Sequence, residues 1–174
     1  WFSVNRGAGI LSDRRFMSGT FGGNRIECNF GEGVKFNNLG YAQFNGNYWD
    51  FNHGCGFSCY GTDNDFDFRG HISFTGNIFY RDGLFDTEEL KDKEKYESSH
   101  ILISDACNVL INSNDFGIGG GEYGKIGPNY SIVHKNLCTS IISGNTMMCG
   151  SKEKNILSLG GELGQVIVKD NVGG

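Results

Sequence analysis

The chain has 174 residues, of which 28 are Gly and one is Pro, and its formal net charge is −5. So much Gly excludes a helical bundle, because an interior helical Gly costs about 1 kcal/mol relative to Ala. The aromatic content of 13% and the charged content of 20% exclude a disordered chain. Scattered basic residues argue against a nucleic-acid partner, and no apolar run is long enough to cross a membrane. We therefore expect one all-β domain over residues 1–174, and, because the chain opens on Trp1 without a leader, a piece of a longer protein.

A short pattern recurs along the chain: an apolar residue, any residue, Gly or Ser, Asn, any residue and an apolar residue. In chain order its copies are FGGNRI, FNGNYW, FTGNIF, INSNDF and ISGNTM, followed by the degenerate VKDNVG. The Asn of each copy serves as a reference position, and these residues are Asn24, Asn47, Asn77, Asn114, Asn145 and Asn171. Such a repeat is typical of architectures that stack similar units on one another.

Each unit keeps one register before its Asn. The residues three before it are all apolar, namely Phe21, Phe44, Phe74, Ile111, Ile142 and Val168. The residues five before it are Gly19, Ala42, Ile72, Val109, Ser140 and Val166. This alternation predicts a short strand with one buried face.

Two further positions complete the unit. The residue seven before the Asn is small in most copies, which predicts a sharp bend. The residue thirteen before it falls in a second short strand, at Leu11, Val34, Asn64, Ile101, Ile132 and Ser158. On this alignment, all variation in length lies in one segment per unit, after the Asn.

The Asn fits a corner between strands, because Asn tolerates left-handed backbone and stacked Asn amides can hydrogen-bond in a column. Helical repeats would need a 3.6-residue period, which is missing, and propeller blades usually run to about 40 residues or more. We therefore predict an all-β parallel β-helix of about six turns, a solenoid with loop insertions at one corner.

Units such as ILISDACNVLINSNDF and IVHKNLCTSIISGNTM resemble coils of right-handed parallel β-helix proteins, and the resemblance covers residues 11–172. This class includes the pectate-lyase-like enzymes and the tailspike or tail-appendage proteins of bacteriophages. The resemblance implies a right-handed coil that binds a bacterial surface polysaccharide, often with cleavage by paired carboxylates. For the phage members it also implies a homotrimer located in the virion tail. Asn52-His53-Gly54 weakly resembles the Gly-His-Gly stretch of polygalacturonases, but their paired aspartates and their Arg-x-Lys are missing.

The variable segments hold most of the carboxylates and many aromatic residues, and they span 25–33, 48–63, 78–100, 115–131 and 146–157. If they all leave the same corner, they form one continuous surface, as insertions in solenoids commonly do. Carboxylates among aromatic rings suit carbohydrate, since sugar C–H groups pack on rings and sugar hydroxyls bond to carboxylates. We expect the substrate-binding residues to include Trp49, Tyr80, Tyr123 and Tyr130.

The longest of these segments carries two candidate acids, Asp82 and Asp86, on either side of the turn Gly83-Leu84-Phe85. Asp86 and Glu89 also form an Asp-x-x-Glu capping box, which predicts a short exposed helix near Thr87 to Tyr96. Asp86 therefore has two interpretations, a catalytic acid and a helix cap.

Two more candidate acids lie in the next unit. Glu122 stands with Tyr123 at the centre of a Gly-rich loop, and Asp115 directly follows Asn114. Glycoside hydrolysis needs two carboxyl groups, about 5 Å apart for retention or about 6.5–9.5 Å for inversion. Loops on adjacent turns start about 4.8 Å apart, so carboxylates from two of them can meet at either spacing. The predicted catalytic residues are Glu122, Asp82, Asp86 and Asp115.

No metal site or cofactor is expected. The spacing of Asp63, Asp65 and Asp67 is similar to a calcium loop, but the Gly and the final Glu of that loop are missing. Cys107 and Cys138 share the position seven before their Asn, which predicts a stack of buried thiols in consecutive turns, with a disulfide as the alternative.

The favoured function is that of a phage tailspike-type β-helix that binds and depolymerises a bacterial surface glycan, either capsule or lipopolysaccharide O-antigen, with acid/base carboxylates. A glycoside hydrolase is favoured over a lyase. One alternative is a non-catalytic receptor-binding or structural tail segment. Another is a free secreted polysaccharide lyase or hydrolase. The expected partners are the glycan and further copies of the chain, with no nucleic acid and no membrane.

Overall fold

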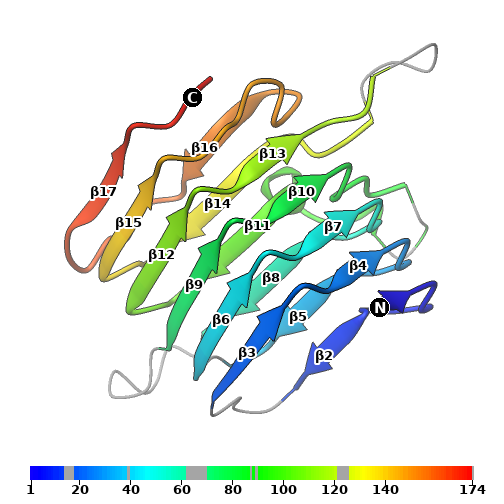
Figure 1. Ribbon diagram of the computed structural model, residues 1–174, viewed down its shortest axis with the longest axis horizontal. Coiled ribbons are helices and arrows are strands. Elements are labelled where there is room, and N and C mark those ends of the chain that lie inside the picture. Colours follow the sequence, from blue (N-terminus) through cyan, green and yellow to red (C-terminus); the bar gives the residue numbers. More distant parts are fainter. Residues whose placement is uncertain are drawn as a thin grey trace.

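The computed structural model describes residues 1–13, 18–38, 40–61, 70–86, 88, 90–120 and 126–173. The described chain is all-β, as predicted, and its strands form three parallel sheets. The chain visits the three sheets in rotation, so most neighbours within a sheet lie three strands apart in chain order (Figure 1). No helix among the described residues has the length and apolar character that crossing a membrane requires.

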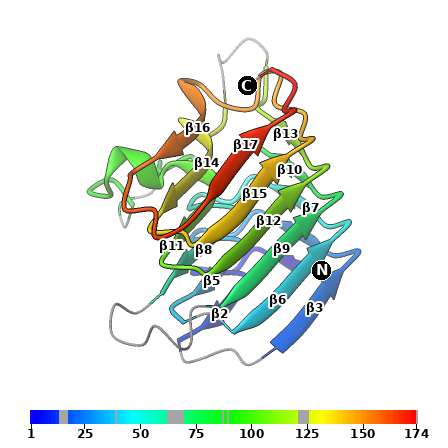
Figure 2. The ribbon, with the colours of Figure 1, turned by 90° about the vertical axis from the view of Figure 1, so that its left-hand side faces the viewer.

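The described strands are short. Sheet A contains β1 (Phe2–Ser3), β4 (Arg25–Glu27), β7 (Tyr48–Asp50), β10 (Ile78–Tyr80) and β13 (Asp115–Gly117). Sheet B contains β2 (Ile10–Ser12), β5 (Val34–Phe36), β8 (Phe57–Tyr60), β11 (Ser99–Ser104), β14 (Tyr130–Lys135) and β16 (Lys154–Ser158). Sheet C contains β3 (Ser18–Gly22), β6 (Tyr41–Asn45), β9 (His71–Thr75), β12 (Asn108–Asn112), β15 (Thr139–Ser143) and β17 (Val166–Lys169), which lie side by side in Figure 2.

The predicted register of the strand before each Asn is confirmed throughout sheet C. Phe44 pairs with Phe21 on one side and Phe74 on the other, and Ile142 pairs with Ile111 and Val168. The inward residues of all three sheets meet in one apolar core. Within it, like side chains stack at the spacing of the strands, as in Trp49 on Phe79 with ring centroids 5.0 Å apart.

A column of Asn side chains forms the corner between sheets C and A. Each Oδ1 accepts the backbone N–H and the Nδ2–H of the Asn one unit earlier, with Nδ2–Oδ1 distances of 2.8 to 3.0 Å. The column runs through Asn24, Asn47, Asn77, Asn114, Asn145 and Asn171, so the predicted stacking is confirmed. We call this column the C–A ladder.

The expectation that the Asn itself takes the left-handed conformation was wrong. The residue before each Asn does so, with φ between 54° and 65° at Gly23, Gly46, Gly76, Ser113, Gly144 and Asp170. Gly is the commonest residue there because it has no Cβ to clash in this conformation. The corner therefore needs two residues with different tasks, one to turn the backbone and one to bond along the column.

The prediction that length varies at one corner only was also wrong. Three residues join β11 to β12, whereas the link from β8 to β9 runs from Gly61 to Gly70. The sheet B position predicted at Asn64 is therefore held by Phe57, which pairs with Ile101. Register slips of one and two residues put Ile10 and Ile156, in place of Leu11 and Ser158, in the same row. Two corners tolerate insertion, and only the C–A corner is constant in length.

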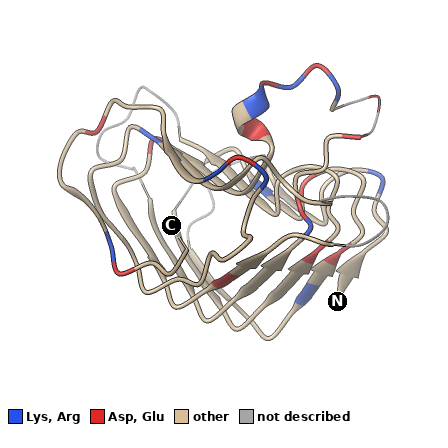
Figure 3. Ribbon diagram, turned by 90° about the horizontal axis from the view of Figure 1, so that it is seen from above, with Lys and Arg blue, Asp and Glu red and all other residues tan. Residues whose placement is uncertain are grey.

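Two local predictions have different outcomes. The stacked thiols are confirmed, with the sulfur atoms of Cys107 and Cys138 3.6 Å apart, although both residues are half-buried rather than buried. The short α-helix is not found in the described part of its predicted span, which holds turns and the 3-10 turn η2 (Lys95–Glu97). The capping box that does form there joins Glu94 to Glu97. The coiled ribbon of η2 stands away from the sheets in Figure 3.

Candidate functional site

The outward face of sheet A carries rows of charged and aromatic side chains. Its strands alternate, so Ile26, Trp49 and Phe79 point into the core while their neighbours point outward. One outward row pairs Arg25, Tyr48 and Ile78, and the next pairs Glu27, Asp50 and Tyr80. We call Arg25, Glu27, Tyr48, Asp50, Tyr80 and the following Arg81 the sheet A strip.

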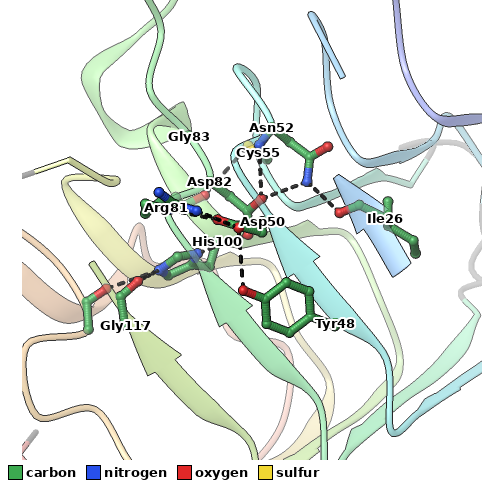
Figure 4. Close-up of polar contacts among 12 residues, drawn as sticks. Ile26, Tyr48, Asp50, Asn52, Cys55, Arg81, Asp82, Gly83, His100 and Gly117 are labelled. Atoms are coloured by element: carbon green, nitrogen blue, oxygen red, sulfur yellow. Dashed lines mark hydrogen bonds and ion pairs between the residues drawn. The ribbon is translucent and has the colours of Figure 1, made fainter. Parts of the chain in front are cut away.

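Arg81 and Asp50 form the centre of this strip (Figure 4). The Arg81 Nε donates to Asp50 Oδ1 over 2.8 Å, and its Nη2 donates to Oδ2 over 2.6 Å. The Tyr48 hydroxyl donates to the same carboxylate over 3.3 Å. The hydrogen bond to Asp50 raises the pKa of Arg81, so the guanidinium keeps its charge in this contact.

Aromatic rings flank these ion pairs. The Arg81 guanidinium lies 4.8 Å from the Tyr80 ring centroid, and that of Arg25 lies 5.1 Å from the Tyr48 ring centroid. Arg25 also pairs with Glu27 at 2.7 Å between Nη2 and Oε2. The strip therefore repeats one combination, an aromatic ring beside a paired Arg and carboxylate, over two successive units.

Behind the strip, a second polar column forms the corner between sheets A and B. Asn5 bonds to Asn29, Asn29 to Asn52, and Asn52 to Asp82, with Nδ2–Oδ1 distances of 2.7, 2.8 and 2.6 Å. Asn52 also donates its backbone N–H to Asp82 Oδ1, and its Nδ2 donates to the Ile26 carbonyl. We call this column the A–B ladder; it ends at Asp82.

His100, from β11, closes the end of the A–B ladder. Its Nδ1 lies 3.1 Å from Asp82 Oδ2, and its Nε2 lies 3.1 Å from the carbonyl oxygens of both Gly117 and Gly150 (Figure 4). Both side chains are completely buried. Desolvation raises the pKa of Asp82, and its hydrogen bonds from His100 and Asn52 oppose that rise.

A second His–Asp pair lies at the surface of the same corner. His53 Nδ1 contacts Asp86 Oδ1, and the imidazole stacks on Phe30 with centroids 5.1 Å apart. Phe51 packs edge-on against the same imidazole and links it to the strip, since the Arg81 guanidinium lies 5.3 Å from the Phe51 ring. His53 Nε2 has no hydrogen bond within the described residues. The carboxylate and the ring stack fix the orientation of the imidazole and leave Nε2 available for proton transfer.

The structure separates the predicted site residues into groups. Asp86 contacts His53 at the A–B corner, and Tyr80 lies on the outward face of sheet A. Asp115 is exposed on the same sheet, in the row of Tyr48 and Ile78. Trp49 and Asp82 are completely buried, so neither has a surface that a glycan can contact. Tyr130 lies at the start of β14, where its hydroxyl donates to Glu153 over 3.3 Å. Glu122 and Tyr123 lie outside the described residues, as do Asp63, Asp65 and Asp67.

Sequence reasoning missed Asp50, Arg81 and His100 as site residues, and it named His53 only through the weak resemblance to polygalacturonases. One signal was present, because Asn29, Asn52 and Asp82 all stand five residues after a ladder Asn. Aligning the units beyond the Asn, as well as before it, would have revealed the A–B ladder. The contact of His100 with Asp82 had no such signal, since it depends on how the long segment between them folds back.

No three His, Cys, Asp or Glu side chains of the described chain gather in a way that could hold a metal ion. Comparisons of the chain with protein families, with curated proteins and with solved structures find no match.

Proposed function

We propose that this chain is a right-handed parallel β-helix of the phage tailspike or tail-appendage type, and that it binds a bacterial surface polysaccharide. The architecture supports this proposal: three parallel sheets visited in rotation, around one core, with a hydrogen-bonded Asn column at a constant corner. The remaining corners carry loops of variable length, which is where solenoid proteins commonly build binding surfaces.

The single observation that carries the binding proposal is the sheet A strip. Tyr48 and Tyr80 offer ring surface to sugar C–H groups, while Asp50 and Arg81 offer acceptors and donors to hydroxyls. The strip spans successive strands of one sheet, so a glycan lying across the strands meets the same combination of groups more than once. Repeated, modest contacts of this kind suit a repeating polymer.

For cleavage, we assign proton transfer to His53, with Asp86 as the residue that orients it. In hydrolysis, one group protonates the leaving glycosidic oxygen and another activates water, so that the C–O bond breaks and water supplies the new hydroxyl. The Asp86 carboxylate orients the imidazole through Nδ1, and Nε2 is the atom that exchanges the proton. Asp115 and Glu122 remain candidates for the second catalytic group, a carboxyl, while the buried Asp82 has a positioning role.

A specific observation favours the non-catalytic alternative. The carboxylates of the strip are paired with guanidinium groups, Glu27 with Arg25 and Asp50 with Arg81. In each pair the guanidinium N–H groups already occupy carboxylate oxygens that a general acid or base would need. A segment that binds the host glycan without cleaving it would need only the strip, and not the His53–Asp86 pair.

One experiment separates the two functions. The protein is incubated with capsule or O-antigen polysaccharide, and glycan binding and new reducing ends are measured together, with ultraviolet absorbance to detect the unsaturated product of a lyase. Depolymerase function predicts that Asp86→Asn and His53→Gln lower the rate by about 100-fold or more while binding persists. The control is Asp92→Asn, which removes an exposed carboxylate from the same segment. Binding without reducing ends in the unmodified protein would establish the receptor-binding alternative.

The homotrimer expected for this class has a natural contact surface in sheet C. Strands β6, β9, β12 and β15 contain no Asp, Glu, Lys or Arg, and their outward side chains line a groove of about 410 Å³. In a chain of net charge −5, copies can meet at this face without bringing carboxylates together. Light scattering should give the mass of a trimer for the unmodified protein and a monomer for Ile141→Glu, whose site is 38% exposed. A monomeric unmodified protein would favour the free secreted enzyme.

A further inference from the structure

A second groove, on the outward face of sheet B, has no role in the site described above. It has a volume of about 320 Å³ and is lined by Tyr60, Tyr96, Leu102, Ser104, Lys135 and Leu159. Tyr60, Ser104 and Lys135 are register partners across β8, β11 and β14, so they form one row across three successive strands. Leu102 points out of the same sheet and is only 1% exposed, which makes it the floor of the groove.

The long segment after β10 builds one wall of this groove by folding back over the sheet. The Tyr60 hydroxyl donates to Glu97 Oε1 over 2.8 Å, and the Cys55 thiol donates to the Glu97 carbonyl over 2.8 Å. Lys95 adds an ion pair with Glu153 at 2.6 Å, which ties the segment to the link before β16. These contacts hold the neighbouring Tyr96 against the groove, so the cavity is formed before any ligand arrives.

Lys135 gives the groove its charge. Five other lysines of the described chain make ion pairs, namely Lys35, Lys91, Lys93, Lys95 and Lys169. Lys135 is exposed, lines the groove and makes no ion pair with a described carboxylate. The two hydroxyls of the row are already engaged, Ser104 donating to Asp105 and Tyr60 to Glu97. The groove therefore offers one free ammonium group beside two aromatic rings and two Leu side chains.

We infer that this groove binds one acidic sugar residue, with its carboxylate on Lys135 and the C–H face of its ring against Tyr96 and the Leu side chains. Aromatic and aliphatic surface suits a pyranose face, and an unpaired ammonium at the edge selects a carboxylate over a hydroxyl. The volume lies at the lower end of the range for small-molecule sites, which fits one sugar residue rather than a long oligosaccharide. The inference rests on the proposed function in one respect: the acidic sugar is taken to be part of the polysaccharide that the protein binds.

The test is a titration of the whole chain with glucuronate and, separately, with glucose, followed by NMR or calorimetry. Saturable binding of glucuronate is expected, with glucose binding at least about 10-fold weaker. Lys135→Ala should weaken glucuronate binding about 10-fold or more, and Tyr96→Ala should weaken both sugars. The matched control is Lys154→Ala, which removes an exposed lysine from another strand of the same sheet and should change nothing.

The outcomes distinguish this inference from the proposed function. Glucuronate binding that is absent, or unchanged in a folded Lys135→Ala variant, overturns the groove assignment even if the polysaccharide binds at the sheet A strip. Glucuronate binding that depends on Lys135, in a protein that binds no bacterial polysaccharide, supports the groove and overturns the proposed function. A Tyr96→Ala variant with unchanged affinity for both sugars would also contradict the assigned binding mode.

Discussion

The two polar ladders follow the same rule at two corners of the molecule and differ in where they end. The C–A ladder passes through every unit, and every rung is an Asn. Two residues separate the sheet C strand from the sheet A strand in each of the four units in which both strands are described. The A–B ladder begins in the same way, with Asn5, Asn29 and Asn52, and then changes to Asp82. In the following units the equivalent positions are Gly119 and Gly150, which have no side chain to continue it.

The difference coincides with a change in the loops. The links from sheet A to sheet B are short and equal as long as the A–B ladder is made of Asn, and the first long segment starts at Arg81 and Asp82. An uninterrupted Asn column fixes the path of the backbone at each level, whereas its end releases the chain to leave the sheets. The long segment then supplies Asp86 to the candidate site and Tyr96 to the sheet B groove.

The largest effect is expected from breaking the uninterrupted ladder at its centre. Asn77 accepts two hydrogen bonds from Asn47 and donates to Asn114 and to the Phe44 carbonyl, and it is 1% exposed. Asn77→Ala should destabilise the protein by about 4 kcal/mol, since each buried polar group left unpaired costs about 1–3 kcal/mol. Urea unfolding followed by circular dichroism measures this loss.

Asn24→Ala is the matched control for that variant. Asn24 stands at the first rung of the same ladder, is half-buried and bonds to Asn47 alone within the column. Its loss should cost about 1 kcal/mol, because water can reach the groups left behind. Equal losses from the two variants would show that position within the ladder is irrelevant.

The end of the A–B ladder gives the next largest effect. Asp82→Leu leaves the buried His100 and the donors of Asn52 without their partner, and should cost about 3 kcal/mol. Asp82→Asn preserves the shape and lets Nδ2 donate to a neutral His100, so it should cost less than about 1 kcal/mol. The two variants are compared by urea unfolding at neutral pH. A loss in Asp82→Asn as large as that in Asp82→Leu would mean that the charge, rather than the hydrogen bonds, holds this corner.

The same pair predicts a dependence on pH. Burial raises the pKa of Asp82 above its ordinary value of 3.8, so the native state binds this proton more tightly than the unfolded state does. The contribution of Asp82 to stability is therefore fully present below that value and is lost as pH rises through the raised pKa. Urea unfolding gives the free energy of unfolding of the unmodified protein and of Asp82→Asn at each pH, from below the ordinary pKa to above the raised one. The difference between the two should shift in favour of the Asn variant as pH rises. Parallel pH profiles would contradict this sign.

The smallest effect is expected in the sheet A strip, where the polar groups face water. Arg81 is partly exposed and its pair with Asp50 is screened by solvent, so Arg81→Ala should cost about 1 kcal/mol or less. Its effect on glycan binding should be larger than its effect on stability, because it removes the donor that orients Asp50. If Arg81→Ala lost as much free energy of unfolding as free energy of glycan binding, the role of Arg81 would be structural, like that of the ladder residues.

The parts of the fold that could be predicted are those in which the same type of residue occupies the same structural position in each unit. Phe44, Phe74 and Ile111 share a register because each must fill the same place in the core, and the Asn column repeats for the same reason. The sheet B strand at Phe57 was misplaced because nothing in the sequence distinguishes an insertion before that strand from one after it. The contacts of Asp86 with His53 and of Asp82 with His100 join segments whose separation in the chain differs from unit to unit, so no repeat reveals them.

The constant two-residue corner makes the protein modular. Removing residues 78–114 would join Asn77 to Asp115, and Asn77 would then face Asn145 in the way that Asn114 does now. Such a deletion removes one complete unit, including Asp82, the long segment and one wall of the sheet B groove. The core residues of the two flanking units would then pair in the same register. Recombination at the C–A corner can thus add or remove one structural unit with its functional residues. The two-residue turn at that corner stays the same.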